Sequence, residues 1–169
     1  MATGIGENWP QREPNHPFAD SDQSPKYRRW HGAQTAQEKL DIGFSFGKYA
    51  WGPGEVLRYH DFNTFVLAAA MDSFLKRQAD PKRHLWDMVV TDVFRPLGIF
   101  QLPILHTWEA AGERRLPLLH YGLYPTIDDL AKLTSLLQHG GQHHGQQLLS
   151  AARLAEALYR TDAKGLPSG

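Results

Sequence analysis

The feature that most constrains this chain is a tight turn at residues 52–54, followed by an apolar run from Thr64 to Arg77. The turn reads Gly-Pro-Gly, in which proline fixes φ and glycine admits positive φ. Asn63 is a good helix N-cap, and the last turn of the run is basic, as the helix dipole favours. We therefore predict a buried helix over residues 64–77, capped by Asn63, with Tyr59 just before its first turn.

Composition bounds the class of protein. The chain has 169 residues, 41% hydrophobic and 11% aromatic, enough for one domain with a real core. Its 18 basic and 18 acidic residues balance, so no net field would recruit a nucleic acid or an anionic membrane. The absence of cysteine excludes disulfides and thiolate-rich metal sites.

The same sequence predicts no membrane-spanning segment. The longest apolar run, residues 65–71, is far shorter than the roughly 20 residues that a spanning helix needs. The first residues lack the basic and apolar regions of a signal peptide. The compartment and the oligomeric state stay open.

The N-terminal part is rich in proline, polar and charged residues, with aromatic residues interspersed. Residues 1–39 therefore predict a long, partly ordered loop, with a short helix over Ala36–Leu40. Residues 43–47 contain too much glycine for more than a loop or an edge strand.

Three more helices are expected downstream. The first is capped by Asp80, has Pro81 at its first position and is stopped by residues 95–98. An exposed turn at residues 112–115 precedes the second, which Thr126 caps and Gly140-Gly141 ends. Its predicted buried face is Leu130, Leu133, Leu136 and Leu137. The third begins at residues 148–150 and runs through Tyr159.

Several of these segments together resemble one family. Pro53-Gly54, Tyr59-His60-Asp61 and Asn63 are similar to the P-G-x-x-x-x-Y-S-[ND]-x-N pattern of the serine β-lactamase-like superfamily. This superfamily includes class C β-lactamases, penicillin-binding proteins and related esterases and amide hydrolases. Residues 93–99 resemble its I-F-x-P-L-G-M element, and residues 121–133 resemble its G-G-L-x-S-T-A-x-D-L-A-x-[FL] element. Residues 136–141 and 148–150 resemble its L-L-x-G-G and I-L-S-P-E segments.

The resemblance implies an α+β, β-lactamase-like fold in which an antiparallel sheet is flanked by helices and joined to a helical subdomain. Residues 1–169 would be part of that domain, mainly its helical part with long loops and few short strands. Within it, residues 1–39 would flank the active site, residues 53–98 would carry the tyrosine motif and two helices, and residues 121–159 would be helical. The segment Met1–Ile5 resembles the M/H-T-S-G-[LI] sequence that follows the family's nucleophile helix. The nucleophile and the final strands would then lie outside the chain, and apolar surface would be exposed.

The family's chemistry gives Tyr59 a role. A serine attacks a carbonyl to form an acyl-enzyme, a lysine one helical turn along relays its proton, and the motif tyrosine acts with that lysine as general base. The ordinary tyrosine pKa of roughly 10 makes this side chain a poor base alone, so it depends on the lysine charge. The resemblance implies a catalytic Tyr59 and a small ester or amide substrate, with no metal or other cofactor.

Two other sequences match the family's catalytic motifs in letters but not in their expected local structure. Ser45-Phe-Gly-Lys48 reads S-x-x-K, but its glycines oppose a helix and it lies too close to Tyr59. His139-Gly140-Gly141 resembles the family's third motif, K/H-x-G, but falls at a predicted helix end. We interpret both as decoys.

Asp61 departs from the asparagine that is usual in β-lactamases. An ionised carboxylate only accepts hydrogen bonds, so it suits a substrate amide carbonyl poorly. Because relatives that act on esters or simple amides often tolerate aspartate there, the resemblance favours an esterase, amidase or peptidase over a true β-lactamase. Asp61 is either a substrate-binding residue or only a turn residue, whereas Asn63 is expected to be a structural cap. Tyr59 itself could simply pack under the helix.

Other clusters have simpler interpretations. His139, His143 and His144 lie in a Gln/Gly-rich turn without a carboxylate, which predicts a solvated loop rather than a zinc site.

Two functions remain: an internal fragment of a serine hydrolase, inactive as the isolated segment, or a non-catalytic helical binding module that keeps the fold. The sequence on either side of residues 1–169 would distinguish them.

Overall fold

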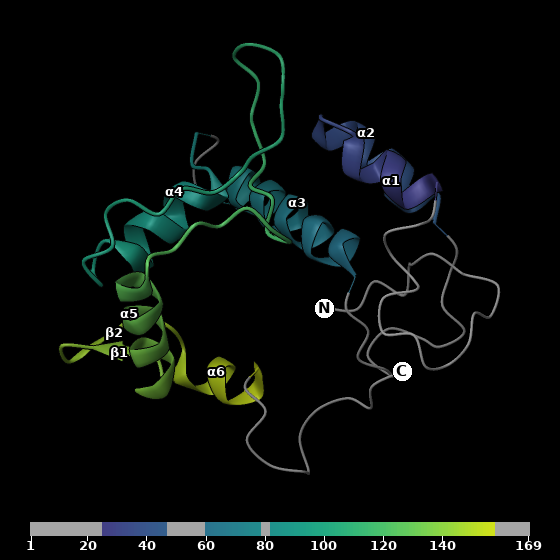
Figure 1. Ribbon diagram of the computed structural model, residues 1–169. Helices are drawn as coiled ribbons and strands as arrows, with labels where there is room; N and C mark the ends of the chain where they lie inside the picture. The colour runs from purple at the N-terminus through teal and green to yellow at the C-terminus, as the bar shows by residue number, and fades with distance from the viewer. Residues whose placement is uncertain (1–24, 47–59, 79–81, 158–169) are drawn as a thin grey trace, which may run out of the picture. The chain divides into compact units, whose positions relative to one another are not determined.

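The computed structural model describes residues 25–46, 60–78 and 82–157, and these are mostly helical (Figure 1). The six α-helices in these ranges are α1 Pro25–Gly32, α2 Ala36–Phe44, α3 Asp61–Gln78, α4 Leu85–Val89, α5 Ile127–Gln138 and α6 Ala151–Ala157. A π-helical turn, η1 Val90–Phe94, continues α4. Strands β1 Gln142–His143 and β2 Gln146–Gln147 form an antiparallel pair with Gln142 opposite Gln147. The expected helical character of the chain is therefore confirmed.

The chain divides into two compact units. Of the described residues, the first unit comprises 25–46, 60–70 and 106–120, and the second comprises 71–78, 82–105 and 121–157. Each unit has its own hydrophobic core. Within the described ranges, no helix combines the length and apolar character that crossing a membrane requires.

Helix α1 was not expected, because residues 1–39 predicted a loop around a single short helix. Pro25 stands at its first position, where a missing N–H costs nothing. Tyr27 and Trp30 lie one turn apart on the same face and are 5% and 0% exposed. A helix this short is stabilised by such tertiary burial rather than by local propensity, which explains why the sequence pattern missed it.

Helix α2 begins where expected and runs further. Thr35 caps it in a capping box: its hydroxyl accepts from the Glu38 N–H, and the Glu38 carboxylate accepts from the Thr35 N–H. The helix continues through Gly43 and Phe44, so the expectation of a loop or edge strand at residues 43–47 is wrong for these two residues. Gly43 is needed because a Cβ there would overlap the Phe62 ring.

Adding a methyl group at Gly43 tests this close approach. We expect Gly43→Ala to destabilise the protein by about 1–3 kcal/mol, because Phe62 is fully buried and cannot move aside cheaply. Gly32→Ala is the matched control, since a Cβ at Gly32 meets nothing within 4 Å. Urea unfolding followed by circular dichroism measures both. Equal midpoints for the two variants would contradict this packing.

Helix α3 contains the predicted apolar helix but begins earlier. Its first residue is Asp61, and His60 occupies the cap: the His60 carbonyl accepts from the Asn63 N–H (3.0 Å), and His60 Nδ1 accepts from the Phe62 N–H (3.2 Å). Asn63 therefore lies inside the first turn, buried, and is not the N-cap that we expected. The His60 ring takes over the acceptor role that Asn63 was expected to fill.

In the second unit, α4 begins at Leu85 rather than near Pro81. His84 is extended (φ −93°, ψ 151°), and the Leu85 N–H donates to the buried Asp72 carboxylate (3.0 Å). Asp72 thus supplies an acceptor at the positive end of α4. Asp80 and Pro81 lie outside the described residues.

The end of this helix is as predicted. The Arg95 N–H donates to Val90 O (2.9 Å), a bond spanning five residues, and Pro96 follows with no N–H to donate. Gly98 then adopts φ +71°. The core around this turn consists of Phe94, Leu97, Ile99, Leu102 and Leu136.

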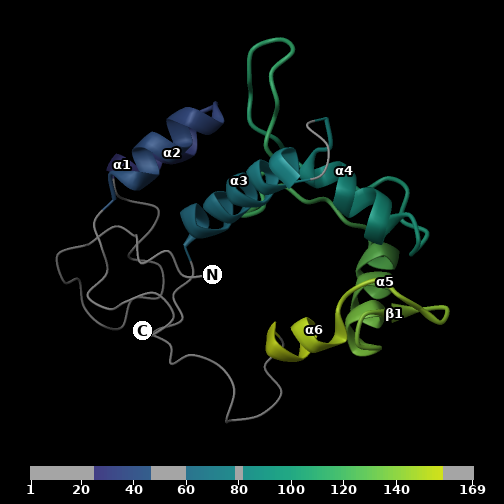
Figure 2. The ribbon, with the colours of Figure 1, turned by 180° about the vertical axis from the view of Figure 1, so that it is seen from behind.

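Helix α5 confirms its predicted caps but not all of its buried face. Thr126 and Asp129 form a capping box, and Gly140 and Gly141 follow the last turn with positive φ. Leu136 is buried and Leu133 packs on the core, whereas Leu130 is 49% exposed and was wrongly expected to be buried. The β1–β2 hairpin follows α5 and is seen beside it from both sides (Figure 2).

The remaining segments follow the sequence pattern. The turn around Gly112 is exposed and closed by a bond from Glu113 N to Ala110 O (2.9 Å). Helix α6 starts after Ser150, and the predicted end at Tyr159 lies outside the described residues. Large apolar side chains are exposed in the second unit, as expected; the most exposed are Phe100 and Ile127.

Candidate functional site

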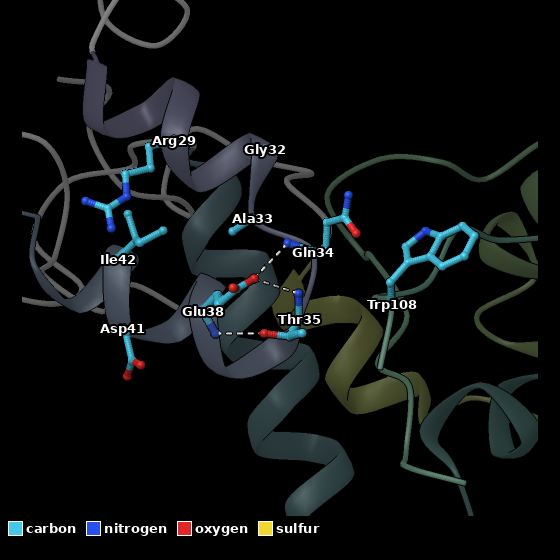
Figure 3. A pocket seen from close by; sticks show the side chains of 9 residues that line it. All are labelled: Arg29, Gly32, Ala33, Gln34, Thr35, Glu38, Asp41, Ile42 and Trp108. Atoms are coloured by element: carbon cyan, nitrogen blue, oxygen red, sulfur yellow. Dashed lines mark hydrogen bonds between the residues drawn. The ribbon is translucent and has the colours of Figure 1, made fainter. Parts of the chain in front are cut away.

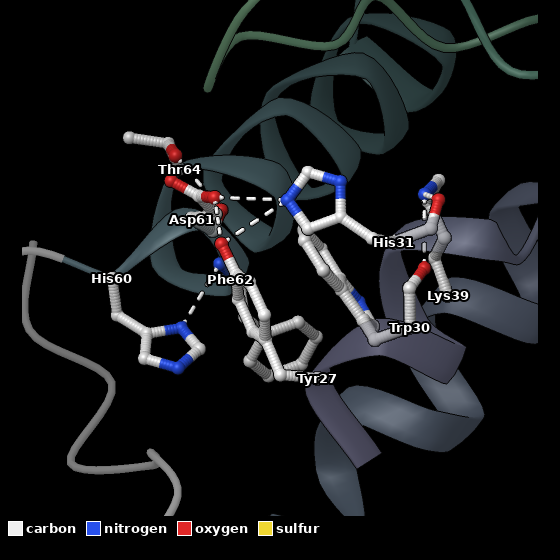
Figure 4. A network of polar contacts seen from close by, with 8 residues as sticks. All are labelled: Tyr27, Trp30, His31, Lys39, His60, Asp61, Phe62 and Thr64. Carbon is white, nitrogen blue, oxygen red and sulfur yellow. Dashed lines mark hydrogen bonds and ion pairs between the residues drawn. The ribbon is translucent and has the colours of Figure 1, made fainter. Parts of the chain in front are cut away.

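The site centres on Asp61, the first residue of α3, two positions after Tyr59 in the sequence. Tyr59 lies outside the described residues, so its predicted role is neither confirmed nor contradicted. Asp61 is described, and its side chain is 15% exposed. Its carboxylate meets two side chains of α1, and we call Tyr27, His31 and Asp61 the Asp61 cluster (Figure 4).

Both donors of the cluster converge on one oxygen. The Tyr27 hydroxyl donates to Asp61 Oδ2, and His31 Nε2 lies 3.3 Å from the same oxygen. His31 Nε2 is also 3.1 Å from Tyr27 Oη. Tyr27 and His31 are four residues apart on α1, which places both side chains on one face of that helix.

This arrangement fixes where the His31 proton sits. The only hydroxyl proton of Tyr27 goes to Asp61, and an ionised carboxylate can only accept. His31 Nε2 therefore faces two acceptor oxygens, and a lone pair there would be repelled. Nε2 must carry a hydrogen, either in the neutral Nε2–H tautomer or in the imidazolium form.

Aromatic rings pack around the cluster and hold Tyr27 in place. The Tyr27 ring stacks on Trp30, with centroids 5.9 Å apart, and meets the His60 ring edge-on at 5.8 Å. Trp30 is fully buried, and its ring centroid lies 6.1 Å from those of Phe62 and Phe65. Such packing restricts the Tyr27 hydroxyl to a narrow range of positions.

A buried lysine closes the C-terminal end of α1. Lys39 is 2% exposed, and its ammonium donates to Trp30 O (3.1 Å) and His31 O (3.3 Å), carbonyls at the negative end of the helix. It also lies 4.7 Å from the centroid of the Trp30 ring. Burial lowers the pKa of Lys39. With its donors committed to these carbonyls, Lys39 anchors α1 rather than offering a nucleophile.

His120 is half-buried beside the Asp61 cluster. Its ring centroid lies 5.1 Å from that of Trp30 and 6.0 Å from that of His31. Burial lowers the pKa of His120 to about 4; the charge of Asp61 opposes this shift, and those of Lys39 and His31 add to it. His120 is therefore neutral at pH 7 and does not compete with His31 for the Asp61 charge.

This neutral His120 predicts a pH dependence of stability. Between about pH 6.5 and about pH 4 the unfolded chain binds a proton at His120 that the folded chain does not, so stability falls as the pH drops through this range. We expect His120 to contribute about 1–2 kcal/mol of this loss, after allowing for its partial exposure. The comparison is the urea midpoint at pH 7 and pH 4.5 for the wild type and His120→Phe. If both lose the same stability, His120 is not the group responsible.

The S-x-x-K-like and K/H-x-G-like sequences both lie at helix ends. Ser45 is the C-cap of α2, and its hydroxyl donates to Ile42 O (2.6 Å), so it does not start a helix as an S-x-x-K serine must. Lys48 lies outside the described residues. His139 is the C-cap of α5, followed by two glycines with positive φ, as expected for a helix end.

A polar hollow of about 710 Å³ lies beside α1 and α2 in the same unit (Figure 3). The Glu38 carboxylate faces it but accepts hydrogen bonds from the Thr35 and Gln34 N–H groups, which lower the pKa of Glu38. Exposed Arg29 and Trp108 also line it. The described residues that line it include no serine, lysine or tyrosine, the side chains that the proposed chemistry requires.

The histidine-rich turn does not assemble metal ligands. His143 is in β1 and His144 in the turn after it, with φ 45°. Over the described ranges, no group of three or more histidine, aspartate or glutamate residues could hold a metal ion.

Sequence reasoning missed Tyr27 and His31, which contact Asp61, and Lys39 and His120, which lie near them. Tyr27, His31 and Lys39 fall in the segment that was predicted to be a loop with one short helix, and no element was predicted at His120. A usable signal was present: Tyr27, Trp30 and His31 are spaced i, i+3, i+4, and Pro25 precedes them.

Comparison with known proteins identifies no relative of this chain. Searches against protein-family models, curated proteins and solved structures find no match to this chain.

Proposed function

We propose that this chain is part of a β-lactamase-related serine hydrolase that acts through an acyl-enzyme on an ester or amide, with Tyr59 as the partner of the catalytic lysine. The proposed fold of the parent domain is the β-lactamase-like sheet flanked by helices. The serine nucleophile and the K/H-x-G motif would be supplied by sequence on either side of residues 1–169.

The observation that carries this proposal is the position of Asp61. The third residue of the motif Tyr59-His60-Asp61 stands at the first turn of an apolar helix, with its carboxylate largely buried and held by two donors. A surface turn residue would not need that arrangement, whereas a motif that must present a tyrosine in a fixed geometry would.

The other matching segments support the same proposal. The residues that resemble I-F-x-P-L-G-M close the α4–η1 helix, and Thr126 in the next element caps α5. The I-L-S-P-E-like segment precedes α6. These three described segments thus lie at helix ends, which supports the proposal.

The identity of Asp61 narrows the substrate class. In the family that the chain resembles, relatives that act on esters or simple amides often carry aspartate at this position, so we expect a simple ester or amide rather than a β-lactam. This restricts the proposed activity to esterase, amidase or peptidase chemistry.

The experiment begins with the coding frame on both sides of this segment. We expect S-x-x-K upstream and K/H-x-G downstream, and we expect the complete product to hydrolyse a p-nitrophenyl ester faster than nitrocefin, a chromogenic β-lactam. A complete frame without these motifs, and a product without activity, would contradict the hydrolase and favour the non-catalytic helical module.

A further inference from the structure

The carboxylate of Asp61 is directed toward α1. Oδ2 accepts from Tyr27 and lies within 3.3 Å of His31 Nε2, and both donors belong to that helix. Figure 4 shows the Tyr27 and His31 side chains meeting at the Asp61 carboxylate at the start of α3. The group that the motif would present to a substrate is thus committed through one oxygen to the protein itself.

We infer that Tyr27 and His31 are positioning residues of the proposed hydrolase: through Oδ2 they fix Asp61, the third residue of the motif, in the first turn of α3. This inference rests on the proposed function and assigns it two residues outside the motif. Neither residue needs to touch the substrate.

The two donors have complementary properties. Tyr27 is 5% exposed and packed against Trp30 and His60, so its hydroxyl is a nearly immobile donor. The His31 side chain is 37% exposed and therefore tolerates replacement without loss of core packing. One donor supplies rigidity, and the other can be varied experimentally with little effect on folding.

The hydrogen bonds to Asp61 are strong enough to hold its carboxylate in place. Hydrogen bonds to an ionised carboxylate are shorter and about twice as strong as neutral ones. Displacing a catalytic group by about 1 Å can cost about 100-fold in rate, so a lost anchor should appear in turnover rather than only in stability. Asp61 also faces the N-terminal end of α3, where the helix dipole favours its negative charge.

The test uses the complete gene product and measures kcat per active site, counted by the burst of product from an activated ester. We expect Tyr27→Phe and His31→Ala each to lower kcat per site by about 10- to 100-fold, the range for losing a hydrogen bond to a charged group. His31→Gln keeps an N–H donor and should retain kcat within about threefold. Tyr124→Phe is the matched control, since Tyr124 is 61% exposed in the other unit.

A purely structural role gives a different result. Fewer folded molecules would lower the burst amplitude and leave kcat per site unchanged, which would overturn the inference. A second measurement is the coupling between Tyr27 and Asp61: Tyr27→Phe should shift the urea midpoint much less in an Asp61→Ala background. Equal shifts in both backgrounds would also overturn it.

The inference and the proposed function fail in distinguishable ways. A wild-type product without hydrolase activity contradicts the function, and the inference with it. An active wild type whose kcat per site is unaffected by Tyr27→Phe and His31→Ala contradicts the inference alone.

Discussion

Replacing Trp30 by alanine is expected to destabilise the first unit by about 3–5 kcal/mol, the largest stability change that we predict. Trp30 is fully buried, and its ring lies within 6.1 Å of the rings of Phe62 and Phe65, measured between centroids. Removing the indole leaves a cavity between α1 and α3 and also takes away the aromatic face under the Lys39 ammonium. Since whole domains are stable by only about 5–15 kcal/mol, this is a large fraction of the total.

The control is Trp108→Ala, because Trp108 is 72% exposed and its backbone N–H bond to Gln34 O survives the substitution. Urea unfolding followed by circular dichroism gives both changes. If Trp30→Ala does not fold, Trp30→Phe, which leaves a smaller cavity, supplies an intermediate value. A Trp30→Ala midpoint equal to that of Trp108→Ala would contradict the assignment of Trp30 to the centre of the core.

Replacing Tyr59 by phenylalanine is expected to lower the kcat/KM of the complete gene product for an activated ester by about 10²- to 10⁴-fold, the usual contribution of a general base. Phenylalanine keeps the ring and loses only the hydroxyl that would exchange a proton with the catalytic lysine. The effect should lie in kcat rather than KM, because the proton transfer is made in the transition state.

Tyr124→Phe provides the comparison here too, as a hydroxyl deletion at an exposed tyrosine. The unfolding midpoint of Tyr59→Phe should stay near that of the wild type. If Tyr59→Phe loses stability but keeps its kcat, Tyr59 is the packed boundary tyrosine that the sequence also allowed.

Local signals in the sequence predicted several of the helix ends. Thr126 with Asp129 gave the start of α5, Gly140 and Gly141 gave its end, and Pro96 with Gly98 gave the end of the preceding helix. These features act within a few residues, so one segment contains all the information that they need. Helix ends of this kind are therefore readable without a tertiary structure.

The errors arose where tertiary contacts decide the outcome. Helix α1 and the last turn of α2 exist because Trp30 and Gly43 pack against Phe62, more than 15 positions away in the sequence. Asn63 was expected to cap α3, but His60 does so, because its ring nitrogen accepts the hydrogen bond that an asparagine oxygen usually accepts. Leu130 fits the helical period, but its side chain remains half exposed.

The candidate site divides in the same way. Asp61 was identified from its neighbours in the motif, which are adjacent in sequence. Its partners Tyr27 and His31 come from a helix 30 or more residues earlier, and no local pattern connects the two segments. A motif identifies which residues matter, whereas only the folded chain identifies what holds them.

The measurement that tests this account most directly is covalent labelling of the complete gene product with a fluorophosphonate, followed by peptide mapping. The account predicts a single labelled serine in an S-x-x-K sequence outside residues 1–169, and labelling that slows by at least about tenfold in Tyr59→Phe. Labelling at Ser45, labelling that is indifferent to Tyr59, or no labelling of a folded product would contradict it.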